Sequence, residues 1–119
     1  MSRLRISNVS RDTVLADRAE IADTSQKRRT GLLQHKSLPR GEGLWIAPCE
    51  AVHTVGMKFA IDVLFLDKKK RVLKIRHSMK QWRVAASLRA HSVLELPAGL
   101  SEETGTKVGD QLEFMKYDG

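Results

Sequence analysis

The segment Ile61–Asp67, with the sequence Ile-Asp-Val-Leu-Phe-Leu-Asp, constrains the fold of this chain more than any other. Its apolar side chains occupy both alternate sets of positions, which is typical of a strand that is buried on both faces. The residues Asp67–Lys70 leave no room for a helix, so they predict a hairpin turn into a second strand over Arg71–Met79. We therefore expect a central antiparallel hairpin.

The second strand of this hairpin carries cations on one of its faces. Side chains alternate between the two faces of a strand. We expect one face to carry Leu73, Ile75 and His77, and the other to carry Val72, Lys74 and Arg76. Lys74 and Arg76 would then project to the same side of the sheet.

The rest of the chain is divided into short elements by turn residues. The other expected strands are Leu4–Val9, Thr13–Asp23, Leu44–Ile46, Ser92–Leu96 and Gln111–Met115. Thr24 or Ser25 can cap a short helix over Gln26–Gln34, and Ala98–Thr104 can form one or two helical turns. The pattern predicts a mainly β (α+β) fold, which is a small antiparallel β-sandwich or a partly closed barrel. No repeat or linker is visible, so we expect a single domain over residues 1–119.

Composition excludes several classes of protein. The longest run of large apolar residues is Val63–Leu66, whereas a bilayer span needs about 20. The segment Met1–Arg5 is basic and lacks the apolar core of a signal peptide. Cys49 is the single cysteine, so no internal disulfide can form, which fits a reducing compartment. We therefore expect a cytoplasmic protein without a membrane span.

The charge of the chain is unevenly distributed. The formal net charge is +7, and the segment Lys68–Leu94 holds nine lysines and arginines but no acidic residue. The segment from Glu95 to the end holds six acidic residues and two lysines. The two blocks can face each other or be solvated, or the basic block can bind polyanions weakly. The candidates for anion binding are Lys74, Arg76 and Arg83.

Reactive side chains cluster only between Cys49 and Thr54. If Pro48 opened a helical turn, Cys49 and His53 would be four residues apart on one face, and His53 could stabilise a thiolate. Alternatively, the two residues could hold a metal together with His77 or His91. The structural alternative is a buried cysteine that packs as a small apolar group. The sequence leaves these interpretations open.

Asp62 is a carboxylate at the start of an apolar strand. Burial of an unpaired charge is costly, so Asp62 requires a partner. The available partners are Arg29, Arg71, Arg83 or backbone N–H groups of the loop that follows His53. Asp62 can therefore be a structural clamp, or an active-site carboxylate paired with His53. No phosphate-binding glycine loop or nucleophilic serine elbow is present, so no familiar class of enzyme is indicated.

Several short motifs together resemble family 192 of the domains of unknown function, which occurs in bacteria and archaea. The matching motifs are Arg29–Leu33, Gly43–Cys49, His53-Thr54, Met57, Asp62–Asp67, Val93–Gly99 and Gly109-Asp110. The resemblance covers roughly residues 23–114. It implies a mostly β, jelly-roll-like sandwich with one or two short helices, and it implies no established reaction, ligand or catalytic residue. Relatives often carry an export signal, so an exported mature form remains an alternative.

These observations favour a small β-sandwich that serves as a binding or accessory module. We expect a pocket near Cys49, His53, Thr54, Met57 and Asp62, with the basic strand as an electrostatic surface. The alternative is a small metal-dependent or thiol enzyme that uses Cys49, His53 and Asp62. The sequence specifies no ligand, metal or cofactor, and we expect a monomer or a weak dimer.

Overall fold

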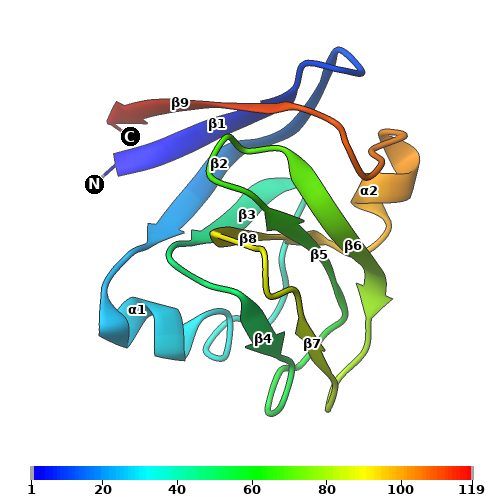
Figure 1. Cartoon of the computed structure of the whole chain (residues 1–119). Helices are drawn as coiled ribbons and strands as arrows, with labels where there is room; N and C mark the ends of the chain where they lie inside the picture. The colour runs from blue at the N-terminus through cyan, green and yellow to red at the C-terminus, as the bar shows by residue number, and fades with distance from the viewer. Residues whose placement is uncertain (1, 119) are drawn as a thin grey trace.

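A computed structural model describes residues 2–118 of the protein. The fold consists of a large curled sheet with a smaller layer against it (Figure 1). The large sheet has seven strands in the order β6-β5-β8-β3-β2-β1-β9. Their bounds are β1 Ser2–Asn8, β2 Thr13–Ala22, β3 Gly41–Ile46, β5 Ile61–Leu66, β6 Val72–Met79, β8 Ser92–Pro97 and β9 Leu112–Asp118. The expected mainly β fold class is confirmed.

The expectation of antiparallel pairing is met at five of the six junctions between neighbouring strands of the large sheet. Neighbouring strands are antiparallel everywhere in the large sheet except between β2 and β3, which run parallel. A parallel pair requires a crossover connection rather than a tight turn. The connection here contains α1 (Ser25–Thr30) and the loop that follows it. The parallel junction therefore places α1 beside the sheet.

The large sheet curls until its two edge strands approach each other at one end. Arg71 and Gln111 form an isolated bridge between the segments that lead into β6 and β9. The Val72 N–H donates to the Asp110 carbonyl at 2.9 Å, and the Leu112 N–H donates to the Lys70 carbonyl at 3.0 Å. The contact is limited to this end, so the sheet is curled but is not closed into a barrel.

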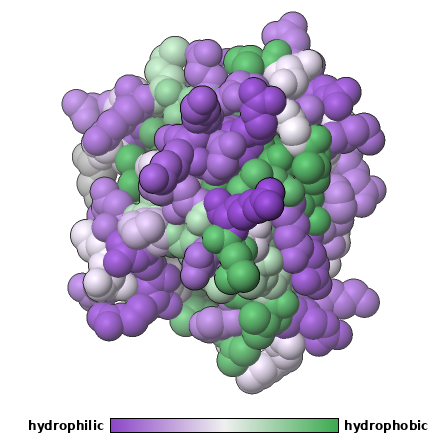
Figure 2. Space-filling model, viewed as in Figure 1, coloured by the Kyte–Doolittle hydropathy of each residue, from purple (hydrophilic) through white to green (hydrophobic). Residues whose placement is uncertain are grey.

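The smaller layer consists of α1 and a two-stranded ribbon. The ribbon pairs β4 (Ala51–His53) with β7 (Val84–Ala86) in antiparallel fashion. Figure 1 places α1 and this ribbon together at the bottom of the view, away from β1 and β9. Val52 and Ala85 point into the core, whereas Val84 is 68% exposed. Figure 2 shows apolar side chains gathered at the bottom of the same view, where the ribbon lies.

The two faces of the large sheet build two separate hydrophobic cores. Inside the curl, Leu64 and Leu66 of β5 pack with residues of β1, β8 and β9. On the other face, Val63 and Phe65 pack with residues from the α1 loop and the ribbon. All six residues of β5 are fully buried, which confirms the prediction of a central strand with two buried faces.

The predicted hairpin between β5 and β6 is confirmed, with one correction. β5 pairs antiparallel with β6, and Asp67 Oδ1 accepts the Lys69 N–H at 2.8 Å in the turn. The pairing contains an irregularity, because Phe65 lies opposite Lys74 whereas Leu66 lies opposite Val72. A bulge shifts the alternation of side chains by one residue. Val72 therefore packs in the same core as Ile75, and the predicted grouping of Val72 with Lys74 was wrong.

The helix α1 is shorter than the sequence predicts. Its N-cap is Thr24, whose side chain accepts the Lys27 N–H at 3.2 Å, as one of the two expected caps. The helix ends at Thr30 rather than Gln34, because Gly31 adopts a φ of 50° that favours glycine and breaks the helix. The second helix, α2, covers Leu100–Glu103 within the predicted helical segment. None of the helices in residues 2–118 is long and apolar enough to cross a bilayer.

Candidate functional site

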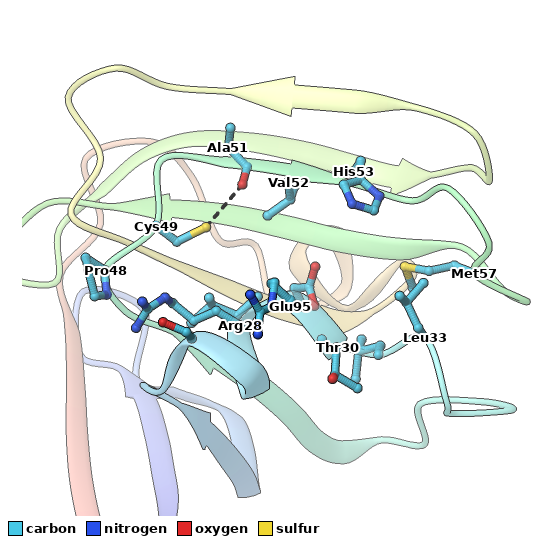
Figure 3. A pocket seen from close by; sticks show the side chains of 15 residues that line it. Arg28, Thr30, Leu33, Pro48, Cys49, Ala51, Val52, His53, Met57 and Glu95 are labelled. Atoms are coloured by element: carbon cyan, nitrogen blue, oxygen red, sulfur yellow. Dashed lines mark hydrogen bonds between the residues drawn. The ribbon is translucent and has the colours of Figure 1, made fainter.

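A cleft of about 630 Å³ lies between α1 and the ribbon, and we call it the α1 cleft. Helix α1 and its loop supply polar and apolar side chains to one wall, and β4 with its flanking loops supplies the opposite wall. Figure 3 shows these two walls on either side of Glu95. The residues that line the cleft include Arg28, Thr30, Leu32, Leu33, Ile46, Cys49, Val52, His53, Met57 and Glu95.

The local sequence explains why a cleft forms here. The left-handed conformation of Gly31 ends α1, and Leu32 and Leu33 then pack toward the sheet. On the opposite side, β4 pairs with β7 only, so no strand fills the space between β4 and α1. Side chains rather than a strand lie between β4 and α1. These side chains do not fill the space, which leaves the α1 cleft.

Glu95 lies at the floor of the α1 cleft. It belongs to β8, where its backbone lies between those of Leu44 on β3 and Val63 on β5. The residue is only 4% exposed, and its side chain lines the cleft. Among residues 2–118, its carboxylate forms no hydrogen bond and no ion pair. Figure 3 shows this carboxylate between Val52 and His53 on one side and Arg28 and Thr30 on the other.

The environment of Glu95 changes its acidity. Burial raises the pKa of the Glu95 carboxyl from 4.5 to about 7, because the charged form loses its hydration and gains no partner. The other two buried acidic side chains, Asp62 and Asp110, are held by several hydrogen bonds. Glu95 therefore differs from them in having its capacity to accept hydrogen bonds unused.

Cys49 lies in the wall of the cleft but does not form the predicted thiolate pair. Residues 51–53 form strand β4 rather than a helical turn, so Cys49 and His53 are not on adjacent turns of a helix. The Cys49 thiol is half-buried and donates to the Ala51 carbonyl at 3.2 Å. Burial is the largest cause that raises the pKa of this thiol, and the nearby carboxylate of Glu95 contributes. The arrangement disfavours a nucleophilic thiolate.

The other expected pocket residues divide into two groups. His53 and Met57 line the α1 cleft together with Cys49. Thr54 is fully buried beside it, where its hydroxyl donates to the Lys80 carbonyl at 2.6 Å and accepts the Arg83 N–H at 2.9 Å. Thr54 therefore joins the ends of the two ribbon strands and does not line the cleft.

Asp62 lies on the opposite face of the large sheet, away from the α1 cleft. Side chains alternate along β5, so Ile61 and Val63 face the core beneath the cleft and Asp62 faces the other way. Its carboxylate accepts hydrogen bonds from the N–H groups of Ser78, Gly99 and Ser101 and from the Ser101 hydroxyl. The expected partners, which were arginines or the loop after His53, do not contact it. No pairing of Asp62 with His53 is found among the described residues.

The structure does not assemble the expected metal ligands. No group of three or more His, Cys, Asp or Glu side chains with the geometry of a metal site occurs within residues 2–118. His77 belongs to β6 and lies beside α2, where its Nδ1 atom is 2.9 Å from Ser101 Oγ. The backbone of His91 pairs with Cys49 and Leu66, but His91 is not among the residues that line the α1 cleft with His53.

The nine cations between Lys68 and Leu94 form no ion pair with any residue in the described range 2–118. Acidic residues of the C-terminal part pair elsewhere, since Glu103 pairs with Arg40 and Asp110 pairs with Arg11. Lys74 and Arg76 are half-buried on β6, and Lys74 donates to the Ala86 carbonyl at 2.8 Å. Arg83 is exposed at the ribbon. Among the described residues, the one close contact between charged groups of the two blocks is therefore that of His77 Nδ1 with Glu102 Oε1 at 3.7 Å, and no lysine or arginine of the basic block pairs with the acidic block.

Two functional candidates were missed by the sequence interpretation. Glu95 interrupts the apolar segment Val93–Leu96, which is the same signal that drew attention to Asp62. Arg28 lies in the short basic helix, and its Nη1 atom donates to the Asp23 carbonyl at 2.9 Å. No local sequence pattern predicts that α1 faces β8 across a cleft, because this arrangement depends on the parallel crossover between β2 and β3.

The fold and the site define a small, mainly β protein with a ligand-sized cleft beside a curled sheet. The family model of DUF192, described as "Uncharacterized ACR, COG1430", matches residues 6–114. The chain belongs to this family. This confirms the resemblance seen in the sequence motifs and extends it toward the N-terminus.

Relatives of known sequence agree with this assignment, and a solved structure shares the fold. A UPF0127 protein of Pyrococcus horikoshii is 33% identical over 116 residues, which cover 92% of this chain and 98% of the relative. A UPF0127 protein of Pyrococcus furiosus is 34% identical over 115 residues, which cover 92% and 97%. A crystal structure of a protein of unknown function from Novosphingobium aromaticivorans has a TM-score of 0.80 at 23% identity, and covers 92% of this chain and 82% of that one. This last similarity shows the fold alone.

Proposed function

We propose that this protein is a binding module that holds a small molecule in the α1 cleft. The molecule has an apolar body, which contacts the walls, and a polar group, which Glu95 receives at the floor. The observation that carries this proposal is the buried carboxylate of Glu95, which has no partner among residues 2–118 and faces a cleft of about 630 Å³.

The chemistry of the cleft supports a small-molecule ligand. Ligand pockets usually have volumes of about 300–1,000 Å³, apolar walls and a few polar groups that orient the ligand. The walls here include Leu32, Ile46, Val52 and Met57, all of which are buried. A buried polar group without a partner costs free energy, and a ligand that supplies the partner recovers part of that cost. Glu95 is therefore placed to orient a ligand.

The alternative of a thiol or metal enzyme has less support. Catalysis by a cysteine requires a thiolate, whereas burial raises the pKa of Cys49. The third member of the suggested set, Asp62, faces the other side of the sheet and uses its oxygens in four hydrogen bonds. We therefore favour binding over catalysis.

Titration of hexan-1-ol into ¹⁵N-labelled protein, followed by NMR, tests the proposal. Hexan-1-ol has an apolar chain and a hydroxyl that can donate to Glu95. The amide signals of residues that line the cleft, such as Thr30, Cys49 and Val52, should shift and saturate. The amide signals of α2, on the other side of the molecule, should stay in place. Shifts that never saturate, or that spread evenly over the molecule, would contradict a specific site.

A second surface supports weak binding of polyanions. The nine lysines and arginines between Lys68 and Leu94 lack ionic partners within residues 2–118, and Lys74 and Arg76 lie on one strand. Release of counterions makes such binding steeply dependent on salt. The double change Lys74→Gln and Arg76→Gln should lower the salt concentration that elutes the protein from heparin. Elution at the same salt concentration as a Lys36→Gln, Lys116→Gln control would exclude β6 as the binding surface.

A further inference from the structure

The floor of the α1 cleft is acidic, although the protein as a whole is basic. The formal net charge is +7, yet Glu95 is the acidic side chain at the bottom of this cleft. Three acidic side chains are buried in residues 2–118, and each of the other two is satisfied by protein donors. Glu95 alone among these three faces a cleft with both of its oxygens unused.

The cations nearest to the cleft do not neutralise Glu95. Arg28 donates to the Asp23 carbonyl at 2.9 Å, and Arg29 is exposed. Neither of them, nor His53 in the opposite wall, forms a hydrogen bond or ion pair with Glu95, and burial alone accounts for its raised pKa. A nearby cation would have lowered that pKa. No cation of the described part of the protein therefore pairs with Glu95.

We propose that the polar group received at Glu95 is an organic cation, namely a primary ammonium group at the end of an apolar chain. This inference rests on the proposed function of the α1 cleft. A primary ammonium supplies three N–H donors and a positive charge, whereas a hydroxyl supplies one donor and no charge. Hydrogen bonds between charged partners are also stronger than those between neutral groups.

The shape and polarity of the cleft fit the rest of such a ligand. The alkyl chain would lie along Leu32, Val52 and Met57, which are buried apolar residues of the two walls. A carboxylate in place of the ammonium would meet the like charge of ionised Glu95. Arg28 lies on the α1 wall, so an anionic ligand would be retained away from the floor. The cleft therefore discriminates by charge at its floor.

Binding of an ammonium group is coupled to the ionisation of Glu95. The ammonium favours the carboxylate, so at pH 6 binding should release a proton from Glu95. An alkylamine has a pKa near that of lysine, about 10.4, and stays charged throughout this range. Affinity for the amine should therefore rise between pH 5.5 and pH 8. Affinity for an alcohol of equal length should not rise over the same interval.

Protection of Cys49 from alkylation provides the experiment. Cys49 is the single cysteine and lines the cleft, so its reaction with iodoacetamide, followed by mass spectrometry, reports occupancy. The probes are hexylamine, hexan-1-ol and hexanoate, which share chain length and differ in charge. Hexylamine should protect Cys49 at about one-tenth of the concentration that hexan-1-ol requires, and hexanoate should protect least.

Two variants separate the role of Glu95 from an effect on folding. Glu95→Gln should remove the advantage of hexylamine over hexan-1-ol while hexan-1-ol still protects. Glu95→Asp keeps the charge and should retain part of that advantage. For each variant, the alkylation rate with ligand is compared with the rate without ligand. A rate without ligand that is lower than the rate in urea shows that the cleft of the variant is folded.

The outcomes distinguish this inference from the proposed function. Protection by hexan-1-ol that equals protection by hexylamine would overturn the assignment of a cation, while binding in the cleft would stand. Stronger protection by hexanoate would also overturn it. Failure of all three probes to protect Cys49 would overturn both the inference and the proposal that the α1 cleft binds small molecules.

Discussion

Ser101 Oγ donates a hydrogen bond to Asp62 Oδ2 at 2.5 Å, and the Ser101 N–H donates to the same oxygen at 2.8 Å. The other oxygen of Asp62 accepts the N–H groups of Ser78 at 2.7 Å and Gly99 at 3.1 Å. One carboxylate thus joins β5 to the end of β6 and to the start of α2. Both Asp62 and Ser101 are fully buried, so water does not replace these bonds.

Replacement of Asp62 should destabilise the protein strongly. Asp62→Ala leaves the N–H groups of Ser78, Gly99 and Ser101 without their acceptor, and breaking a network centred on a buried carboxylate costs about 3–5 kcal/mol. Ser101→Ala removes a single donor and should cost about 1–3 kcal/mol. Unfolding in urea, followed by circular dichroism, measures both losses.

Glu102→Ala is the control for this pair of variants. Glu102 belongs to the same helix as Ser101 but is exposed, so its loss should change the free energy of unfolding by less than about 0.5 kcal/mol. If Asp62→Ala cost no more than Glu102→Ala, Asp62 would not be a structural clamp.

The free energy of unfolding should depend on pH through the ionisation of Glu95, and Glu95→Gln should remove this contribution. Its pKa is raised from 4.5 to about 7 in the folded protein, so the folded state holds this proton more tightly than the unfolded state. The stability associated with protonated Glu95 is fully present below pH 4.5 and is lost as the pH rises through about 7. The shift corresponds to about 3 kcal/mol, at 1.36 kcal/mol per pKa unit. Glu95→Gln should therefore become more stable relative to the native protein as the pH rises from 4.5 to 8.

The control for this comparison is a glutamate on the surface of the protein. Glu113 is exposed on β9, so Glu113→Gln should show no such growth in relative stability with pH. Urea unfolding at four pH values between 4.5 and 8 gives both curves. A constant difference between Glu95→Gln and the native protein would show that Glu95 finds a partner in solution.

The large sheet could be predicted in outline because its central strands have strong local patterns. The apolar segment Ile61–Asp67 and the Asp67 turn predicted the β5–β6 hairpin. The two strands of the ribbon are only three residues long, so Ala51–His53 and Val84–Ala86 lack a detectable period. Their pairing joins segments that are far apart in the chain and depends on the core beneath them.

The candidate site could be predicted only in part, for a geometric reason. Cys49, His53 and Met57 all line the α1 cleft, because all three belong to β4 or its flanking loops. Asp62 is close in sequence but faces the other side of the sheet, because β5 alternates between two cores. Glu95, like Asp62, is an acidic residue in an apolar segment of the sequence. Only the pairing of the strands shows that Glu95 lies beneath the cleft and that Asp62 does not.

Cys49 should react with alkylating reagents more slowly than an exposed cysteine does, although it lines the α1 cleft. Burial is the main cause that raises the pKa of the thiol, so little thiolate is present near neutral pH. The rate with iodoacetamide at pH 8 should be several-fold lower in the folded protein than in the protein unfolded by urea. Because the Glu95 carboxylate also raises this pKa, Glu95→Gln should react faster than the native protein at the same pH.

A rate in the folded protein equal to that in urea would contradict the buried environment of the thiol. The control is the dependence of the rate on pH. A lowered plateau at high pH would indicate blocked access, whereas a shift of the curve to higher pH would indicate the raised pKa. The prediction for Cys49 is a shift of the curve.

Phe65→Ala should test the core that supports the α1 cleft. Phe65 is fully buried in β5 and packs with residues from the α1 loop and the ribbon, so its loss leaves a cavity. The expected decrease in the free energy of unfolding is about 3–5 kcal/mol, measured by urea unfolding. Leu88→Ala is the matched control, because Leu88 is 86% exposed and its loss should cost less than about 0.5 kcal/mol. A small effect of Phe65→Ala would mean that the layer of α1 and the ribbon packs on the sheet without this side chain.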